Sequence, residues 1–460
     1  MKAEGWVITD WPWLRRLLVS RWPQWLVGAT ALGVFVYLSL AGFLGTPVGN
    51  RNPAITLVWI AWWGALILVL VPLGGRLWCI ICPLPLPGEW AQRGGLMQPD
   101  GRRRRGLGLR WPRRWRNLWL QNLGFLGLAL FSAPILTLPR VTAWVLLGLV
   151  SLALIVSLIF ERRAFCRYLC PVGGFIGVYS LISPLSLRVK DPEVCRSHLT
   201  KDCVHGNEHG HGCPWIVYPA TLTRNTDCGL CLECLRTCPL DNVAVVWRPL
   251  PSEPAQGAVP KPLRLDEVYK GAIMLAAAMV YSAVMLGPWG AFKQAASEVF
   301  SPAWLAYAGI LLVLALVVVP GGLASASWLS AALGLGGYAR GHDGLRQAAA
   351  GLIPLGLGAW AAFSLGFVFA NGSYVLNSLS DPLGLGWDLL GTAELTWRPA
   401  LTGLTPFLER LALLFGMAAA ARATLRHLPG LPSWLRRFEA ALPVLLVYGL
   451  YGAALMVVLL

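Results

Sequence analysis

The chain has 460 residues, of which 56% are hydrophobic and only 13% charged, and its mean hydropathy is +0.59. Soluble globular proteins carry about 25% charged residues, so this composition excludes a soluble globular protein and predicts an all-α polytopic membrane protein. The formal net charge is +16. Because Lys and Arg gather in the cytoplasmic loops of membrane proteins, this charge indicates topology, and no nucleic-acid partner is expected.

Apolar stretches define the predicted spans. Residues 1–23 precede the first stretch and lack an apolar core followed by a small-residue cleavage site, so no removable signal peptide is expected. The stretch at 402–421 is the weakest span, because it contains Glu409 and Arg410 and charges within a membrane are costly. A span needs roughly 20 apolar residues, and about nine candidates lie near residues 24–46, 55–74, 117–136, 141–160, 269–290, 303–325, 347–370, 402–421 and 440–460.

The basic residues alternate from loop to loop. Most of them lie before the first span and in every second loop after it, including the run Gly-Arg-Arg-Arg-Arg-Gly at 101–106. The other loops hold one basic residue each, namely Arg51, Arg140, Lys293 and Arg398. Since cytoplasmic loops are enriched in Lys and Arg, this asymmetry predicts a cytoplasmic N-terminus and a C-terminus outside.

Four regions follow from this pattern. They are a cytoplasmic N-terminal segment at 1–23, a four-helix membrane core at 24–170, a cytoplasmic domain at 171–268 and a five-helix membrane extension at 269–460. The third region is rich in Cys, His and Pro, and we expect a bacterial-ferredoxin-like α+β domain there. Within it, residues 172–187 are apolar but too short to span, which predicts a surface-lying or re-entrant helix.

The most informative motif lies in that third region. All eleven cysteines lie between Cys79 and Cys238, on the side predicted to be cytoplasmic, where disulfides do not persist. The last four, Cys228, Cys231, Cys234 and Cys238, read C-x2-C-x2-C-x3-C-P. In bacterial ferredoxins three cysteines of this run hold one [4Fe–4S] cluster and the fourth ligates the other. Zinc is disfavoured, because zinc sites prefer two C-x2-C pairs separated by a longer loop.

A second cluster needs further ligands upstream. Cys195, Cys203 and Cys213 lie there at wider spacing. By the crossing rule, the first cluster takes Cys213 with Cys228, Cys231 and Cys234, and the second takes Cys195, Cys203 and Cys238 with an open fourth position. Candidates for that position are His205, His209 and His211. The alternatives are that these histidines form a solvated loop, that a membrane cysteine completes the site, or that the second cluster is absent.

Two further motifs end alternate spans. Cys79-Ile-Ile-Cys82-Pro83 follows the second span and Cys166-Arg-Tyr-Leu-Cys170-Pro171 follows the fourth. Both lie at the inner ends of spans that run the same way, so four thiolates could converge below the bilayer. Basic residues that could offset their charge are Arg76, Arg163 and Arg167. A third metal cluster, redox-active thiols and inert structural thiols all remain open.

These motifs resemble the polyferredoxin-type membrane proteins associated with periplasmic nitrate and nitrous-oxide reductases, the NapH and NosR type. Cys166, Cys170 and Pro171 match the second membrane motif of that family, and Cys79, Cys82 and Pro83 match the first with one residue fewer. The ferredoxin run matches as well, and the resemblance covers roughly residues 24–250. It implies a bacterial inner-membrane protein with two [4Fe–4S] clusters that exchanges electrons with the quinone pool and a partner oxidoreductase.

The expected function is therefore membrane-bound iron–sulfur electron transfer between the quinone pool or a cytoplasmic donor and a partner oxidoreductase. We expect an electron-transfer subunit, with quinol oxidation left open, and we assign no catalytic residue. No predicted span contains histidine and no C-x-x-C-H occurs, so no haem is expected. The alternative is copper reduction or delivery for a maturing metalloenzyme, because the membrane cysteines could hold Cu(I). The outer loops lack His and Met, which favours electron transfer.

Overall fold

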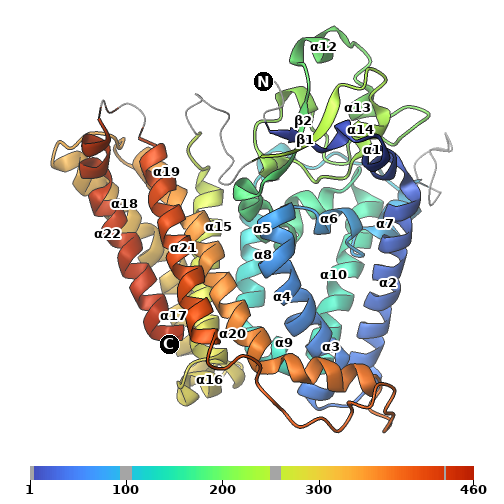
Figure 1. Ribbon diagram of the computed structural model, residues 1–460, viewed down its shortest axis with the longest axis vertical. Coiled ribbons are helices and arrows are strands. Elements are labelled where there is room, and N and C mark those ends of the chain that lie inside the picture. The colour runs from blue at the N-terminus through green and yellow to red at the C-terminus, as the bar shows by residue number, and fades with distance from the viewer. Residues whose placement is uncertain (1–4, 94–105, 249–260, 429–430, 432, 460) are drawn as a thin grey trace. The chain divides into compact units, whose positions relative to one another are not determined.

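The computed structural model describes residues 5–93, 106–248, 261–428, 431 and 433–459 (Figure 1). Arg102–Arg105 of the predicted arginine run and residues 249–260 of the predicted cytoplasmic domain lie outside these ranges. The chain forms two compact units. The first comprises Met1–Ser39, Val69–Gln121 and Trp144–Gly257, and the second comprises Leu40–Leu68, Asn122–Ala143 and Ala258–Leu460.

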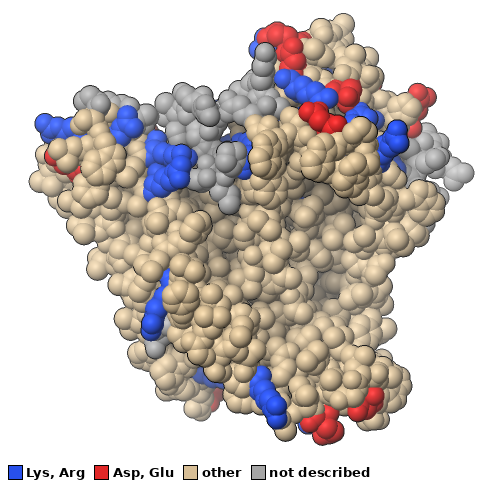
Figure 2. Space-filling view, in the orientation of Figure 1, with Lys and Arg blue, Asp and Glu red and all other residues tan. Residues whose placement is uncertain are grey.

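Seven helical stretches in the described residues are long and apolar enough to cross a membrane. Four are single helices, namely α2 (Arg21–Leu44), α10 (Pro139–Ile159), α15 (Leu265–Met285) and α22 (Trp434–Leu459). The others are composite: Pro53–Gly74, Pro302–Ala332 and His342–Ser380. On the face shown in Figure 2, charged side chains are sparse along the helices and gather near their ends, as expected for spans.

Two of the composite stretches contain short π-helical segments, and the third, His342–Ser380, contains a 3-10 turn. The stretch Pro53–Gly74 consists of α3 (Pro53–Ile55), η3 (Thr56–Trp62), α4 (Trp63–Ala65), η4 (Leu66–Leu70) and α5 (Val71–Gly74). The stretch Pro302–Ala332 consists of α17 (Pro302–Val313), η10 (Leu314–Val318) and α18 (Val319–Ala332). The stretch His342–Ser380 consists of α19 (His342–Ala348), η11 (Ala349–Gly351) and α20 (Leu352–Ser380). Gly75 ends the first of these stretches with φ +57, a conformation that glycine adopts without steric penalty. The turn brings the chain directly to Arg76 and the first cysteine motif.

Two of the nine predicted spans are not among the seven. The stretch expected at 117–136 is two helices, α8 (Trp119–Leu130) and α9 (Ser132–Thr137). Pro134 explains the break, since its ring clashes with the carbonyl four residues earlier, at Leu130, and it has no N–H to donate. The stretch expected at 402–421 is one helix, α21 (Thr405–Arg426). It is long enough, but its charged residues keep it below the apolar character of a span.

The first unit contains a small α+β layer. Strands β1 (Trp6–Val7), β3 (Val243–Trp247) and β2 (Leu185–Val189) form an antiparallel sheet in that order, with Leu187 opposite Val245. Short helices surround it: α1 (Pro12–Val19), α12 (Pro192–Ser197), α13 (Asp202–His205) and α14 (Glu233–Thr237). The core below the sheet combines aliphatic side chains with Cys203 and Cys234. Residues 6–7 thus join the sheet of the region predicted at 171–268, although the sequence suggested a separate N-terminal segment.

Residues 172–187 do not form a surface-lying helix, and the re-entrant alternative stays a prediction. Helix α11 (Pro171–Tyr179) and the turn η7 (Ser180–Ile182) are followed directly by β2, and Phe175 and Tyr179 are fully buried. Glycines make this burial sterically feasible: a Cβ at Gly174 would lie 2.7 Å from Gln121 Oε1, and one at Gly177 would lie 2.1 Å from Arg76 Nη2. The apolar composition of the segment therefore reflects a buried core helix.

The second unit is built around α15, most of whose residues are buried. Trp360 of α20 donates a hydrogen bond from its indole nitrogen to the Met274 carbonyl at 3.0 Å. Its ring packs edge-on against Tyr281 and Phe363, with centroids 5.4 and 5.7 Å away. Gly358 and Gly416 let the backbones of α20 and α21 approach closely. The short helix α16 (Gly290–Ser297) connects α15 to the next stretch.

Candidate iron–sulfur sites

The ferredoxin run forms a tight loop that leads into α14. Leu230 and Leu232 have φ values of +51 and +63, a left-handed conformation that is unfavourable for leucine and persists only where the surroundings fix it. These two turns reverse the chain on either side of Cys231. Cys238 ends α14 with an extended backbone, as the residue before a proline requires. The loop therefore turns its cysteines inward at some conformational cost.

The structure brings Cys213, Cys228, Cys231 and Cys234 together, and we call these four the first ferredoxin-side set. Burial raises the pKa of the Cys228 thiol to about 11, and the Cys213 thiolate adds to this rise. Burial likewise raises the pKa of Cys231 and Cys234, with Cys213 contributing to both. The influence of Cys213 on all three thiols indicates that it lies near them, although it is fifteen residues before the next member.

Cys195, Cys203 and Cys238 form a second gathering, called here the second ferredoxin-side set. Burial raises the pKa of the Cys203 thiol to about 12, and the next largest effects come from Cys195 and Cys238. Asn242 bridges the other two members. Its side-chain amide donates to Cys195 Sγ at 3.1 Å and its backbone N–H donates to Cys238 Sγ at 3.3 Å.

The three candidate histidines contact different parts of the first unit. His209 is exposed and lies 3.5 Å from Glu208. His211 donates its backbone N–H to Glu233 at 2.9 Å and lines a pocket with Glu89 and other residues outside the second set. His205 is exposed on α13, two residues after Cys203. In the described ranges no group of three His, Cys, Asp or Glu residues is close enough to hold a single metal ion.

The two membrane motifs reach a similar geometry through different helical turns. Helix α6 (Trp78–Ile81) carries Cys79, and Cys82 ends it. The π-helix η6 (Phe165–Leu169) carries Cys166, and the Cys170 N–H bonds the Phe165 carbonyl five residues earlier at 2.9 Å. A π turn contains one residue more than an α turn. The missing residue of the first motif is therefore matched by a wider turn in the second.

The four cysteines of these motifs, Cys79, Cys82, Cys166 and Cys170, converge and are called here the membrane-motif set. Burial raises the pKa of the Cys82 thiol, and Cys170 and Cys79 raise it further. Burial also raises the pKa of Cys166, whose neighbours include all three other members. Cys170 caps α11 and accepts a hydrogen bond from the Gly173 N–H at 3.2 Å.

A buried ion pair that the sequence did not predict lies beside this set. The guanidinium of Arg163 binds both carboxylate oxygens of Glu89, on α7 (Leu86–Arg93), with Nη2 at 2.9 Å from Oε2. Burial alone would raise the pKa of Glu89, but Arg163 and Arg93 hold it at about 2. Arg163 Nη1 also donates to the Cys79 carbonyl at 3.1 Å. Glu89 stands alone in the sequence LPGEW, where no motif marks it.

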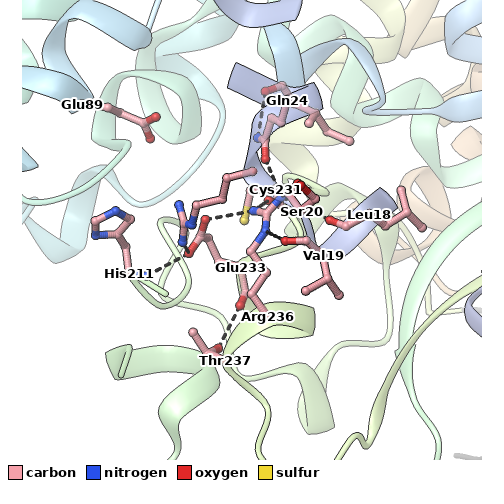
Figure 3. A network of polar contacts seen from close by, with 12 residues as sticks. Leu18, Val19, Ser20, Gln24, Glu89, His211, Cys231, Glu233, Arg236 and Thr237 are labelled. Atoms are coloured by element: carbon pink, nitrogen blue, oxygen red, sulfur yellow. Dashed lines mark hydrogen bonds and ion pairs between the residues drawn. The ribbon is translucent and has the colours of Figure 1, made fainter. Parts of the chain in front are cut away.

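A second polar network supports the ferredoxin run (Figure 3). Arg236 of α14 donates to the Val19 carbonyl at 2.8 Å and to Gln24 Oε1 at 2.7 Å. It also donates to the Cys231 carbonyl at 3.3 Å and pairs with Glu233 at 3.1 Å. One side chain thus joins the cysteine loop to the end of α1 and the beginning of α2.

The donor set of these sites suits iron–sulfur ligation. The thiols are buried in apolar surroundings, where a free thiolate is unfavourable and a thiolate bound to iron is neutralised. Backbone N–H groups aim at several sulfurs, including Leu230 at Cys228 and Val217 at Cys213, at 3.4 and 3.5 Å. Such N–H groups surround cysteinyl clusters and tune their potentials. A four-iron cluster is larger than one ion, so its ligands need not meet the spacing of a single-ion site.

Comparison with known proteins identifies the two membrane motifs. A family described as a 4Fe-4S binding domain matches residues 55–110 and 142–189. The chain is also 32% identical over 89 residues to YccM of Escherichia coli (strain K12), which is named as an electron transport protein. This alignment covers 19% of the chain and 22% of that relative. No solved structure matches.

The chain carries a polyferredoxin-like 4Fe–4S binding region in a helical membrane protein. The resemblance predicted from the cysteine motifs is confirmed at this level. Each matched segment contains one apolar span and one Cys-Pro motif, so the matched region holds the whole membrane-motif set. The ferredoxin-side cysteines lie beyond it.

Proposed function

We propose that this protein is a membrane-bound electron-transfer protein that passes electrons between the quinone pool or a cytoplasmic donor and a partner oxidoreductase. The observation that carries the proposal is the convergence of the membrane-motif cysteines, Cys79, Cys82, Cys166 and Cys170, within the segments that match a 4Fe-4S binding domain. The likeness to an electron transport protein supports the same class of function.

The ligands are proposed as follows. The first ferredoxin-side set holds one [4Fe–4S] cluster, and the membrane-motif set holds another. The second ferredoxin-side set supplies three thiolates to a further cluster. Its fourth position is left open: His205 lies two residues after buried Cys203 on α13, is exposed and faces away from it, and His209 and His211 have their contacts elsewhere.

Clusters of this kind accept and release single electrons, with potentials set by their ligands, burial and hydrogen bonds. The chain supplies those determinants. The apolar core around Cys203 and Cys234 excludes water, and the N–H groups aimed at the sulfurs favour the more negative, reduced form. The Arg236 network fixes the Cys231 loop against the beginning of α2, which holds the first set in a constant position near a span.

A pocket in the first unit lies beside two of the cysteine sets. Its lining combines the apolar side chains of Trp25, Ile80 and Leu86 with several charged ones, namely Arg21, Glu89, Arg93, Arg163 and Glu233. Trp25 lies in the second turn of the span α2, where tryptophan commonly marks the membrane interface. Quinone sites are mostly apolar, so the quinone part of the proposal rests on the family resemblance and not on this charged pocket.

We also propose an inner-membrane location with the cysteine sets on the cytoplasmic side and the C-terminus outside. The support is the asymmetric distribution of Lys and Arg among the loops of the sequence. This topology is tested by fusing a reporter enzyme that is active only in the periplasm to Leu460. We expect the fused reporter to be active.

The proposed function is tested by anaerobic purification in detergent, counting iron and acid-labile sulfide per chain and recording EPR spectra of the reduced protein. We expect about twelve irons and as many sulfides, since each [4Fe–4S] cluster contains four of each. About eight irons per chain would show that one of the three proposed sites holds no cluster. Copper or zinc in place of iron would refute the electron-transfer proposal and favour metal delivery.

A further inference from the structure

Two buried arginines hold equivalent positions in the two membrane motifs. Arg76 lies three residues before Cys79, and Arg163 lies three residues before Cys166. Their exposed fractions are 3% and 6%. A buried guanidinium is uncommon and has to be offset by negative charge or by well-formed hydrogen bonds.

Each arginine reaches across to the other motif. Arg163 Nη1 donates to the Cys79 carbonyl at 3.1 Å. In return, Arg76 Nη1 donates to the Gly173 carbonyl at 3.1 Å, and the N–H of Gly173 is the donor to Cys170 Sγ. The two side chains therefore cross-link the halves of the membrane-motif set.

Arg76 also touches the loops that carry the first ferredoxin-side set. Its Nη2 donates to the Thr226 carbonyl at 3.1 Å, two residues before Cys228. Its guanidinium lies over the ring of Trp215, 4.5 Å from the ring centroid. Trp215 follows Cys213 by two residues. One positive charge is thus adjacent to two cysteine sets.

The two arginines differ in charge compensation. Arg163 is bound by the Glu89 carboxylate, so the pair is close to neutral. In the described residues the hydrogen-bond acceptors of Arg76 are the backbone carbonyls of Gly173 and Thr226, and its Nε is buried without an acceptor. The negative charge that offsets Arg76 must therefore come largely from the neighbouring thiolates and whatever they bind.

The fold reserves space for this arrangement. A Cβ at Gly177 of α11 would lie 2.1 Å from Arg76 Nη2 and 2.8 Å from its Cζ. Because α11 is buried and Gly177 carries no side chain there, the guanidinium can lie close to the helix. Replacing Gly177 with alanine would push the charge away while keeping the residue itself.

We infer that Arg76 is a positioning residue whose charge, paired with no described carboxylate, raises the reduction potentials of the clusters held by the membrane-motif set and the first ferredoxin-side set. The inference rests on the proposed iron–sulfur function. The physical reason is that reduction adds one negative charge to a buried cluster, and a nearby fixed positive charge stabilises that form more strongly where water is excluded. Arg163, neutralised by Glu89, contributes much less to the potentials.

The test compares Arg76→Gln and Arg76→Lys with the control Arg113→Gln, which removes an exposed arginine. Iron per chain is counted first, and the potentials are then measured by EPR-monitored redox titration. A wild-type protein without iron would refute the proposed function itself. With iron present, Arg76→Gln should lower both potentials by the equivalent of at least tenfold in the equilibrium constant, about 59 mV for one electron. Arg76→Lys should lower them by less than half as much, and Arg113→Gln should leave them unchanged.

Two results would overturn the inference. Unchanged potentials in Arg76→Gln would show that the charge is not felt, and equal shifts in the Gln and Lys variants would show that packing rather than charge is responsible. If Arg76→Gln binds no iron, Gly177→Ala takes its place in the titration. We expect that variant to lower both potentials, because it displaces the guanidinium, and unchanged potentials there would also contradict the inference.

Discussion

The ferredoxin-side sets and the membrane-motif set gather cysteines by different means. The core of the first ferredoxin-side set comes from one continuous loop, Cys228–Cys234, whose left-handed leucines turn the thiols inward. The membrane-motif set comes from two segments that are more than eighty residues apart in the sequence. A local spacing specifies the former, whereas the latter depends on tertiary contacts such as the Arg163–Glu89 pair. The two regions should therefore respond differently to mutation.

The largest expected effect separates the regions by their iron. Replacing Cys228, Cys231 and Cys234 with serine should remove about four irons per chain and leave the membrane-motif set loaded. Iron and sulfide counts with EPR spectra measure this. Loss of nearly all iron would show that the sets do not form independently.

Breaking the buried ion pair should destabilise the membrane-motif set. Arg163→Ala leaves the Glu89 carboxylate buried without its main partner, and removing one member of a buried pair costs about 3–5 kcal/mol. Thermal unfolding in detergent measures the loss. The matched control is Arg93→Ala, whose partly exposed side chain lies 3.4 Å from Glu89 and should contribute about 1 kcal/mol or less. Equal losses in both variants would contradict the role of the pair.

The same pair predicts a pH dependence. The pKa of Glu89 is about 2 in the folded protein against an ordinary value of 4.5. Its contribution is therefore fully present above pH 4.5 and is lost as the pH falls towards about 2, a change of about 3 kcal/mol. The difference in unfolding temperature between wild type and Glu89→Gln should shrink over that window. A constant difference would contradict the low pKa.

On the ferredoxin side, the Arg236 network should give a smaller effect. Arg236→Gln removes charge-assisted hydrogen bonds to Val19 and Gln24, with an expected loss of about 1.5–3 kcal/mol. Hydrogen exchange in α1 should increase, because its last carbonyls lose their donor. The control Arg15→Gln breaks an exposed pair with Asp241 and should cost less than about 1 kcal/mol. Unchanged hydrogen exchange of α1 in Arg236→Gln would show that Arg236 does not fix α1 to the cysteine loop.

The smallest expected effect concerns the second ferredoxin-side set. Asn242→Ala removes the side-chain amide that donates to Cys195 Sγ at 3.1 Å, while the backbone donor to Cys238 remains. Because N–H donors to sulfur favour the reduced state, the potential of this site should fall by less than the tenfold equivalent expected for Arg76→Gln. A larger shift than that of Arg76→Gln would reverse the ranking of charge over hydrogen bonding.

The sequence predicted those features that depend on local pattern. The C-x2-C-x2-C-x3-C-P spacing identified the ferredoxin run, and hydrophobic stretches identified seven apolar helices that the structure contains. The predictions at 117–136 and 172–187 were less accurate for a physical reason. Composition reports that a segment is apolar, but neither the break imposed by Pro134 nor the burial of α11 inside the first unit changes composition.

Contacts between segments far apart in the sequence could not be predicted, because no local pattern marks them. Glu89 has no motif, so its pairing with Arg163 emerges only when α7 and the second motif are brought together. The unequal spacing of the membrane motifs looked like a departure from the family pattern. It is balanced by the π turn at Phe165–Leu169, whose hydrogen bond to Cys170 spans one residue more. Ligand assignments in all three sets remain predictions.

The central claim is that the membrane-motif cysteines hold an iron–sulfur cluster of their own. The most direct test replaces Cys79, Cys82, Cys166 and Cys170 with serine and compares iron, sulfide and reduced-state EPR with the wild type. We expect a difference of about four irons per chain and the loss of one cluster signal, while the remaining signals persist. Equal iron in the two proteins, with an unchanged spectrum, would contradict it.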